Sequence, residues 1–258
     1  VDGKKMAEVP RKASPGSDFT KFQLGEYWHG NPGSSSLDEL RIYGKKLSAE
    51  DVLKDYLLHA AKAVSGSAPV SLGLGTGKAK VNGVIEPGEY ALSVSGMNNS
   101  MNANVQYSPK QSRCCLAWDE QNLYVGIQSP VSGTLKTSHS ERDANLWEDD
   151  AVELFFSGFD GKKDLYQFIF NSGKGMYDSK NRKSGWQSSG IRFQSSVKNG
   201  FWSFECAIPW KNFDFVPGDG RSFRMNLCRD FAQSNDWTCL APGDYFAVPS
   251  YPKVTLLK

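Results

Sequence analysis

Short runs of alternating apolar and polar residues fill the chain after residue 112. They stand at residues 113–129, 150–158, 164–172, 191–210, 222–231 and 251–258. Successive side chains of a β-strand point to opposite faces, so this alternation predicts strands that bury one face. Helical periodicity is almost absent after residue 64. The pattern therefore predicts an all-β fold, an antiparallel β-sandwich of the immunoglobulin or jelly-roll-like type.

Two turn signals indicate how some of these strands connect. Asn199-Gly200 interrupts the run at 191–210, and Asn-Gly is a strong signal for a two-residue hairpin turn. The polar residues 119–122 interrupt the run at 113–129 in the same way. Both runs are therefore predicted to be β-hairpins, which favours antiparallel pairing.

The first part of the chain has a different pattern. Residues 18–27 and 37–43 alternate as strands do, and residues 49–63 carry apolar side chains at helical spacing. Ser48 precedes this segment as a good N-cap, and two acidic residues occupy the first turn. We therefore predict one helix near residues 49–63.

A segment rich in Gly and Ser separates the two patterns at residues 65–77. This composition is typical of a flexible linker. The chain is thus predicted to contain residues 1–64, the linker 65–77 and a β-sandwich over 78–258. Because Asp2-Gly3 reads as the turn of a hairpin without its first strand, we expect a fragment of a longer parent chain with neighbouring domains.

The charge balance excludes some partners. Thirty Lys and Arg residues face 28 Asp and Glu residues, which gives a formal charge of +2. Such a balance indicates neither a basic nucleic-acid-binding surface nor an acidic tail. No apolar stretch approaches the roughly 18–20 residues that a membrane span needs. We expect no nucleic-acid partner and no membrane span.

The cysteines form no recognisable metal or redox motif. None belongs to a CxxC pair, and no histidine stands at zinc-ligand spacing from any of them. We favour small buried side chains on strands over disulfides, and an odd count leaves at least one thiol unpaired within the chain. The five are Cys114, Cys115, Cys206, Cys228 and Cys239.

The stretch DANLWEDDAVELFF, at residues 143–156, places five acids and a tryptophan before an apolar run. A glycosidase needs two carboxylates roughly 5–9 Å apart that face the sugar from opposite sides. Asp149 and Asp150 are adjacent, and no second acid-rich phrase offers a partner. A GxSxG nucleophile motif is also absent. The sequence therefore predicts a protein that is not an enzyme.

Several phrases follow one another in a recognisable order over residues 78–258. The series opens with AKVNGVIEPGEY and CLAWDEQNLYVGIQSP. NLWEDDAVELFF, YQFIFNS, GFWSFECAIPW, RMNLCRDF and a final VTLL follow. Together they resemble carbohydrate-binding module family 9. The resemblance implies a β-sandwich without catalysis that binds an oligosaccharide or polysaccharide by stacking the sugar on aromatic side chains. A flat ring suits the apolar C–H face of a sugar, and polar groups suit its hydroxyls.

The resemblance also implies roles for particular residues. Trp147 matches the first aromatic platform, and Glu153 matches an acid that accepts hydrogen bonds from sugar hydroxyls. Tyr245, in the loop before the last strand, is the nearest match to a second platform.

One family position departs from the expected pattern. The strand YQFIFNS commonly carries an arginine among the ligand contacts, and Ile169 stands at that position here. Gln167 and Asn171 lie two residues to either side on the same strand face, so we predict that they partly compensate. The predicted carbohydrate-binding residues are thus Trp147, Glu153, Tyr245, Gln167 and Asn171.

The phrase GNPGSSSLDELRIYGKKLSAEDV carries a second resemblance. It is similar to the closing segment of laminin-G-like, concanavalin-type jelly rolls, and VDGKK is similar to an earlier strand of that family. This resemblance covers about residues 1–55 and implies the C-terminal end of such a sandwich. Taken with the module after it, the chain is expected to come from a secreted or surface bacterial protein that processes polysaccharides. The expected location is extracellular, at the cell surface or in the periplasm.

Family 9 modules usually hold structural calcium, so calcium is an expectation of the resemblance. Asp119, Asp160 and Asp164 are candidate oxygen ligands, but no EF-hand spacing is present and the metal ligands stay unassigned. No organic cofactor is predicted.

Two other functions stay open at this point. The sandwich could be a scaffold that has lost sugar binding, which the missing arginine favours. A haem-binding redox module is less favoured, because its candidate ligands stand in no recognised phrase. Those candidates are Met97, Met101, Met176, Met225 and the three histidines.

Overall fold

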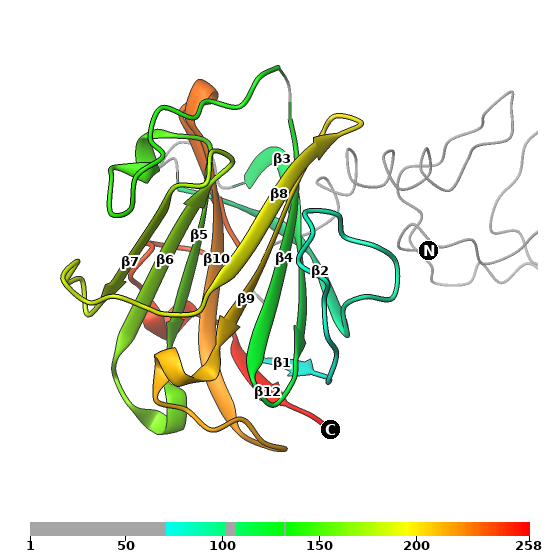
Figure 1. The fold of residues 1–258 in the computed structure, drawn as a ribbon, viewed down its shortest axis with the longest axis vertical. Helices are drawn as coiled ribbons and strands as arrows, with labels where there is room; N and C mark the ends of the chain where they lie inside the picture. The colour runs from blue at the N-terminus through cyan, green and yellow to red at the C-terminus, as the bar shows by residue number, and fades with distance from the viewer. Residues whose placement is uncertain (1–70, 102–106, 132) are drawn as a thin grey trace, which may run out of the picture. The chain divides into compact units, whose positions relative to one another are not determined.

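The computed structural model of the protein describes residues 71–101, 107–131 and 133–258 (Figure 1). The predicted strands at 18–27 and 37–43, the helix near 49–63 and the laminin-G-like segment at 1–55 lie outside the described residues.

Twelve strands make up about half of the described part of the chain. They are β1 (Ser71–Leu74), β2 (Leu92–Ser100), β3 (Tyr107–Trp118), β4 (Asn122–Pro130), β5 (Ala151–Ser157), β6 (Leu165–Asn171), β7 (Met176–Lys180), β8 (Arg192–Lys198), β9 (Phe201–Pro209), β10 (Ser222–Phe231), β11 (Asp236–Cys239) and β12 (Lys253–Leu256). The helical segments described are short 3-10 helices at Leu146–Glu148, Phe159–Gly161, Trp210–Phe213, Ala232–Ser234 and Val248–Ser250. The all-β prediction is confirmed, and each alternating run contains the strand or hairpin predicted for it.

The strands form one curled sheet in the order β7-β6-β5-β10-β11-β2-β3-β4-β9-β8, with neighbours antiparallel. Strand β12 pairs with β10, and β1 pairs with β12 in parallel. The two ends of this order come together, because Phe170 on β6 lies 4.8 Å from Phe193 on β8 and 5.0 Å from Phe204 on β9 between ring centroids. The curled sheet therefore packs against itself as the predicted antiparallel sandwich (Figure 1).

Strand β5 is buried on both of its faces. Val152, Leu154 and Phe156 enter the central core between the layers. Phe155 points to the opposite face, where it packs against aromatic residues of the segment 245–251. The outer face of β5 is thus covered rather than solvated, and Glu153 shares this covered face.

The predicted hairpins have the expected turns. Asn199 has a φ of 54° and Gly200 a φ of 79°, which are the two left-handed residues of a type I′ turn. The turn between β3 and β4 is closed by the Asp119 N–H, which donates to the Asn122 carbonyl at 3.0 Å. Both hairpin predictions are confirmed.

The described sheet begins inside the segment that composition assigned to a linker. Ser71–Leu74 forms β1, with Leu74 buried and Leu72 packed against the core. Leu72 and Leu74 alternate with Ser71 and Gly73, so the strand has one apolar face. Pairing with β12, which lies at the far end of the chain, gives this face a place to pack.

All five cysteines are buried and unpaired. Trp118, Trp202 and Trp210 are buried as well, which agrees with their positions in the alternating strands. Among the described residues, no helix is both long and apolar enough to cross a membrane.

Candidate functional site

A cleft of about 430 Å³ opens on the outer face of β5 and β6. Its lining combines aromatic rings with a few polar side chains. The lining residues are Trp147, Glu153, Gln167, Ile169, Tyr177, Arg182, Trp237, Tyr245 and Phe246. Four of the five predicted site residues are among them, namely Trp147, Glu153, Gln167 and Tyr245.

Strand register brings the floor of the cleft together. Glu153 pairs with Ile169 across β5 and β6, and Ile169 pairs with Tyr177 across β6 and β7. Gln167 lies two residues from Ile169 and therefore shares its face of β6. Glu153 is only 3 % exposed. Its carboxyl group thus lies at the bottom of the cleft, where a ligand inside the cleft can contact it.

Two groups of aromatic rings line the cleft. Trp147 comes from the 3-10 helix before β5, is 45 % exposed, and meets Tyr177 edge-on with 5.8 Å between ring centroids. Tyr245 comes from the loop before β12 and stacks on Phe155 at 5.7 Å. Phe246 meets Phe155 edge-on at 5.6 Å. The platforms predicted at Trp147 and Tyr245 therefore line one cleft, although they are distant in sequence.

The acids beside Trp147 are structural rather than part of the cleft. The Asp149 carboxylate accepts hydrogen bonds from the N–H groups of Ser138 and His139, at 2.8 and 2.9 Å. The Asp150 carboxylate pairs with Arg229 at 2.8 Å. Burial would raise the pKa of Asp149, but these backbone donors and a side-chain donor lower it overall. The two acids anchor the segment that carries Trp147.

Asn171 does not line this cleft, in contrast to the prediction. Its side-chain amide donates to the Asp149 carboxylate at 2.9 Å, and its carbonyl oxygen accepts from the N–H groups of Gly173 and Gly175. It shares a strand face with Ile169, but it stands at the end of β6, where the following turn and Asp149 occupy it. Asn171 is 1 % exposed and so has a supporting role.

Two buried carboxyl groups meet at the floor. The Gln167 amide donates to Glu153 Oε2 at 2.8 Å, and the Tyr245 hydroxyl donates to Asp230 Oδ1 at 3.0 Å. Asp230 Oδ2 accepts no hydrogen bond from the described residues. Burial is the main cause that raises the pKa of both acids, and for Asp230 the neighbouring Glu153 raises it further. Because ionising both neighbouring acids is unfavourable, the arrangement favours a state in which Glu153 and Asp230 share one proton.

Sequence reasoning missed several residues of the cleft. Arg182 stands in a turn, and Tyr177 and Trp237 stand on the short strands β7 and β11, whose register is not readable from the sequence. For Asp230 the sequence contained one usable signal. It stands two residues from Cys228 in an alternating run, so the two side chains are expected on the same face of the strand. Phe246 directly follows Tyr245, and two adjacent aromatic residues in a loop could have indicated a shared binding surface.

The carboxylates suggested for calcium do not fit such a site. Asp119 accepts from the N–H groups of Gln121 and Asn122 and from the Tyr124 hydroxyl. Asp160 pairs with Arg221, and Asp164 pairs with a lysine. Their oxygens already serve protein donors, and the described residues hold no group of three His, Cys, Asp or Glu side chains placed to bind a metal ion.

The candidate haem ligands that the structure describes do not form a site either, and His29 and His59 lie outside the described residues. Met97 and Met225 are fully buried in the central core, and His139 lies beside Asp149. These positions serve packing and loop anchoring.

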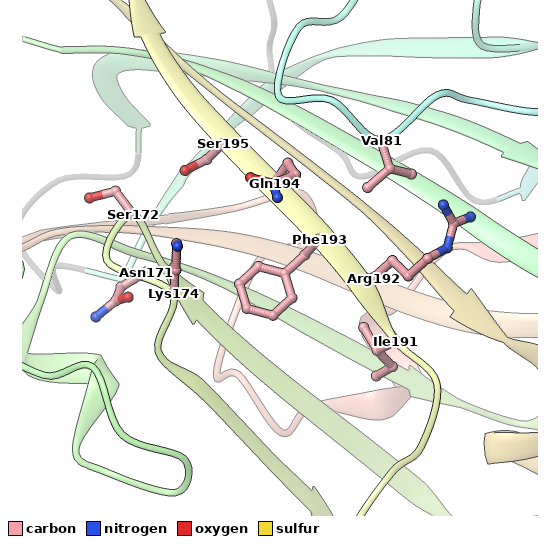
Figure 2. Close-up of a pocket in the computed structure, with 9 residues that line it drawn as sticks. All are labelled: Val81, Asn171, Ser172, Lys174, Ile191, Arg192, Phe193, Gln194 and Ser195. Atoms are coloured by element: carbon pink, nitrogen blue, oxygen red, sulfur yellow. The ribbon is translucent and has the colours of Figure 1, made fainter.

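A second cleft, of about 570 Å³, lies between the β6–β7 turn and strand β8 (Figure 2). Figure 2 shows Phe193 at its centre, with Lys174 and Arg192 on opposite sides. Asn171 also borders it. A single aromatic ring lines this cleft, whereas five line the first, so the first cleft is the better candidate for stacking a flat or ring-shaped ligand.

Comparison with known proteins identifies the family of the chain. Residues 90–238 match the family model described as carbohydrate family 9 binding domain-like. The chain belongs to this family. The recognition of a family 9 module is thereby confirmed, while the model does not reach residues 1–55, where the laminin-G-like resemblance stays a prediction. No curated protein sequence matches the chain.

Three solved structures share the fold. A candidate carbohydrate-binding protein from Bacteroides uniformis has a TM-score of 0.55 at 15 % identity, covering 72 % of this chain and 98 % of its own. A family 9 module from Caldicellulosiruptor kristjanssonii in complex with cellotriose has a TM-score of 0.51 at 14 % identity, covering 72 % and 93 %. The same module in complex with glucose gives 0.52 at 14 % identity, covering 72 % and 95 %. At these identities the likeness establishes the fold.

Proposed function

We propose that the protein binds an oligosaccharide, or part of a polysaccharide, in the cleft between Trp147 and Tyr245. One observation carries the proposal. Five aromatic rings line a cleft of about 430 Å³ whose floor presents a carboxyl group and an amide, Glu153 and Gln167. Sugar rings combine apolar C–H faces with polar edges, and this lining offers a partner for each.

Trp147 is the main stacking platform in this account. Its exposed fraction of 45 % is unusual for a tryptophan in a chain that buries Trp118, Trp202 and Trp210. Its position is fixed by the buried Asp149 network rather than by burial of the indole. A ring held in place while exposed loses little conformational freedom when a sugar packs on it.

The floor provides selectivity. Glu153 accepts from sugar hydroxyls, and Gln167 offers both a donor and an acceptor. Because these groups are shielded from water, a sugar that leaves one of them without a partner loses affinity.

Binding without bond cleavage agrees with the placement of the acids. A glycosidase holds two carboxyl groups on either side of the scissile bond, roughly 5–9 Å apart. Glu153 and Asp230 instead lie close together on one floor, with Asp230 fully buried. The family is one of binding modules, which points the same way.

The wider context is also part of the proposal. A single cleft of this size binds weakly, so the module gains from attachment to a larger secreted or surface bacterial protein that processes polysaccharides. The solved structures that it resembles come from bacteria, and two of them hold cellotriose or glucose. Glucose-based oligosaccharides are therefore the first ligands to test.

A tryptophan-fluorescence titration tests the proposal. Oligosaccharides should shift the emission of the wild type in a saturable way, and Trp147→Ala should weaken binding by at least about tenfold, or about 1.4 kcal/mol. Val197→Ala is a matched control, because Val197 is 54 % exposed and does not line the cleft. Circular dichroism should show that both variants keep the fold.

The competing scaffold function predicts a different outcome. In that case no saccharide shifts the emission even at tens of millimolar, and both variants behave like the wild type. That result would reject sugar binding and leave a sandwich that only joins domains.

A further inference from the structure

Arg182 stands in a backbone conformation that arginine rarely adopts. The turn after β7 has two central residues, Asn181 and Arg182, with φ values of 54° and 63°. The Lys183 N–H closes the turn by donating to the Lys180 carbonyl at 3.0 Å. Two left-handed residues define the type I′ turn, whose second position strongly favours glycine. An arginine that is kept at such a strained position invites a functional explanation.

The turn is firmly attached to the sheet. The Asn181 N–H donates to the Leu165 carbonyl at 2.7 Å, and the Asn181 side-chain oxygen accepts from the Leu165 N–H at 2.9 Å. The Asn181 amide also donates to Asp164 at 2.8 Å. These contacts fix the backbone from which the Arg182 side chain extends.

Aromatic stacking then places the guanidinium group at the cleft. Arg182 lies over the Phe246 ring, with 4.4 Å from the guanidinium carbon to the ring centroid. Both residues line the cleft that contains Trp147 and Glu153. Stacking uses the face of a guanidinium group and leaves its N–H edges free to donate.

Arg182 also lacks an acidic partner in the described part of the chain. Arg142, Arg221 and Arg229 each pair with an aspartate there. Arg182 forms no ion pair with any described residue. It is the cation of the cleft lining, and its natural partner is a carboxylate supplied from outside.

We propose that Arg182 binds the carboxylate of an acidic sugar, so that the cleft prefers an oligosaccharide containing uronic acid. The inference rests on the proposed sugar-binding function and names the ligand class. A guanidinium group matches a carboxylate in a two-pronged hydrogen bond. A uronic acid carries a carboxylate at one edge and hydroxyls at the others. The carboxylate suits Arg182 at the rim of the cleft, and the hydroxyls suit Glu153 and Gln167 on the floor.

The acids on the floor set the orientation of the ligand. A sugar carboxylate near Glu153 and Asp230 would meet like charge or compete for their shared proton. The carboxylate is therefore directed to Arg182, and the ring hydroxyls are directed to Glu153 and Gln167.

The test compares neutral and acidic sugars of the same linkage and length. Calorimetric titrations with trigalacturonate and galactotriose, and with glucuronate and glucose, should show at least about a tenfold preference for the acid form. Arg182→Gly should abolish this preference, with a loss of affinity at least about tenfold larger for the acid form than for the neutral form. Higher salt should reduce the preference of the wild type, because the pair lies at an exposed rim.

Lys174→Gly is the matched control. Lys174 is also an exposed cation with a positive φ, 72°, but it lines the second cleft. Both glycine variants should raise the thermal midpoint, since glycine adopts these conformations without strain. Only Arg182→Gly should change the preference for the acidic sugar.

Three results would overturn the inference. Equal affinity of the wild type for both forms would show that the cleft does not select charge. An equal loss of both affinities in Arg182→Gly would show that Arg182 contacts hydroxyls instead. The absence of binding to every neutral and acidic sugar would reject the proposed function itself, and this inference with it.

Discussion

Glu153 and Asp230 show how one shared proton can satisfy a buried site. Each carboxyl group receives one protein hydrogen bond, from Gln167 and Tyr245 respectively, and Asp230 Oδ2 depends on the neighbouring acid. The pKa of both groups is raised in the folded state, so the folded chain keeps protons to a higher pH than the unfolded chain, whose carboxyl groups ionise near pH 4. The two acids thus give the cleft floor an acceptor for sugar hydroxyls, and their burial lowers the stability of the fold as pH rises.

The pair predicts a stability that falls as pH rises above the ordinary carboxyl pKa of about 4. A carboxyl group with a raised folded pKa binds more protons when folded, so the unfolding free energy decreases by up to about 1.4 kcal/mol per pH unit and retained proton. The lowered pKa of Asp149 acts only at more acidic pH. Urea denaturation at several pH values measures this slope.

Asp230→Asn is the matched variant for this prediction. The amide keeps an acceptor for Tyr245 and offers a donor to Glu153, while it removes one titrating group. The variant should have a flatter profile between pH 5 and 8 than the wild type. Equal slopes in the two proteins would contradict the shared proton.

At the scale of elements, irregular segments are held by single buried side chains. Glu205 on β9 is fully buried and accepts from the N–H groups of Asn82, Gly83 and Val84, at 2.9, 2.8 and 3.1 Å. Its other oxygen accepts from the Tyr90 hydroxyl at 2.8 Å. One carboxylate therefore fixes the long connection between β1 and β2 against the sheet.

Glu205→Ala should destabilise the fold by about 3 kcal/mol, because it removes the acceptor of the Asn82 and Gly83 N–H groups and of the Tyr90 hydroxyl, and each buried unsatisfied group costs about 1–3 kcal/mol. The Val84 N–H keeps a second acceptor, the Asn82 side-chain oxygen. Glu205→Gln should cost less, about 1 kcal/mol, since one amide oxygen still accepts from the loop. Chemical denaturation measures both values. A loss below about 0.5 kcal/mol in the alanine variant, typical of an exposed position, would show that water replaces the carboxylate.

The sequence predicts elements better than it predicts neighbours. Strands such as β5 and the Asn199-Gly200 turn follow from local alternation and turn chemistry. The strand face of Glu153 could be predicted, because Val152 and Leu154 on either side of it point into the core. Asn171 is misplaced because its contact with Asp149 depends on how far the strand extends before the turn. Arg182 and Trp237 reach the cleft only through long-range pairing, which leaves no local signal.

At the scale of the whole molecule, the side chains on both faces of β5 are buried. Above its outer face, the described residues leave a cleft. The inner face joins the central core, and the segment 245–251 covers part of the outer face. The uncovered part lies between this segment and Trp147, and it forms the cleft. The fold could be recognised over 78–258 because phrases from several strands keep one order, and the family model over residues 90–238 agrees.

The position of a bound sugar tests the central claim most directly. A crystal structure of the protein with the tightest-binding oligosaccharide should show a sugar ring packed on the Trp147 indole, with hydroxyls near Glu153 and Gln167. A sugar bound instead in the second cleft, beside Lys174 and Phe193, would contradict the account, because that site contains none of the stacking residues on which it depends.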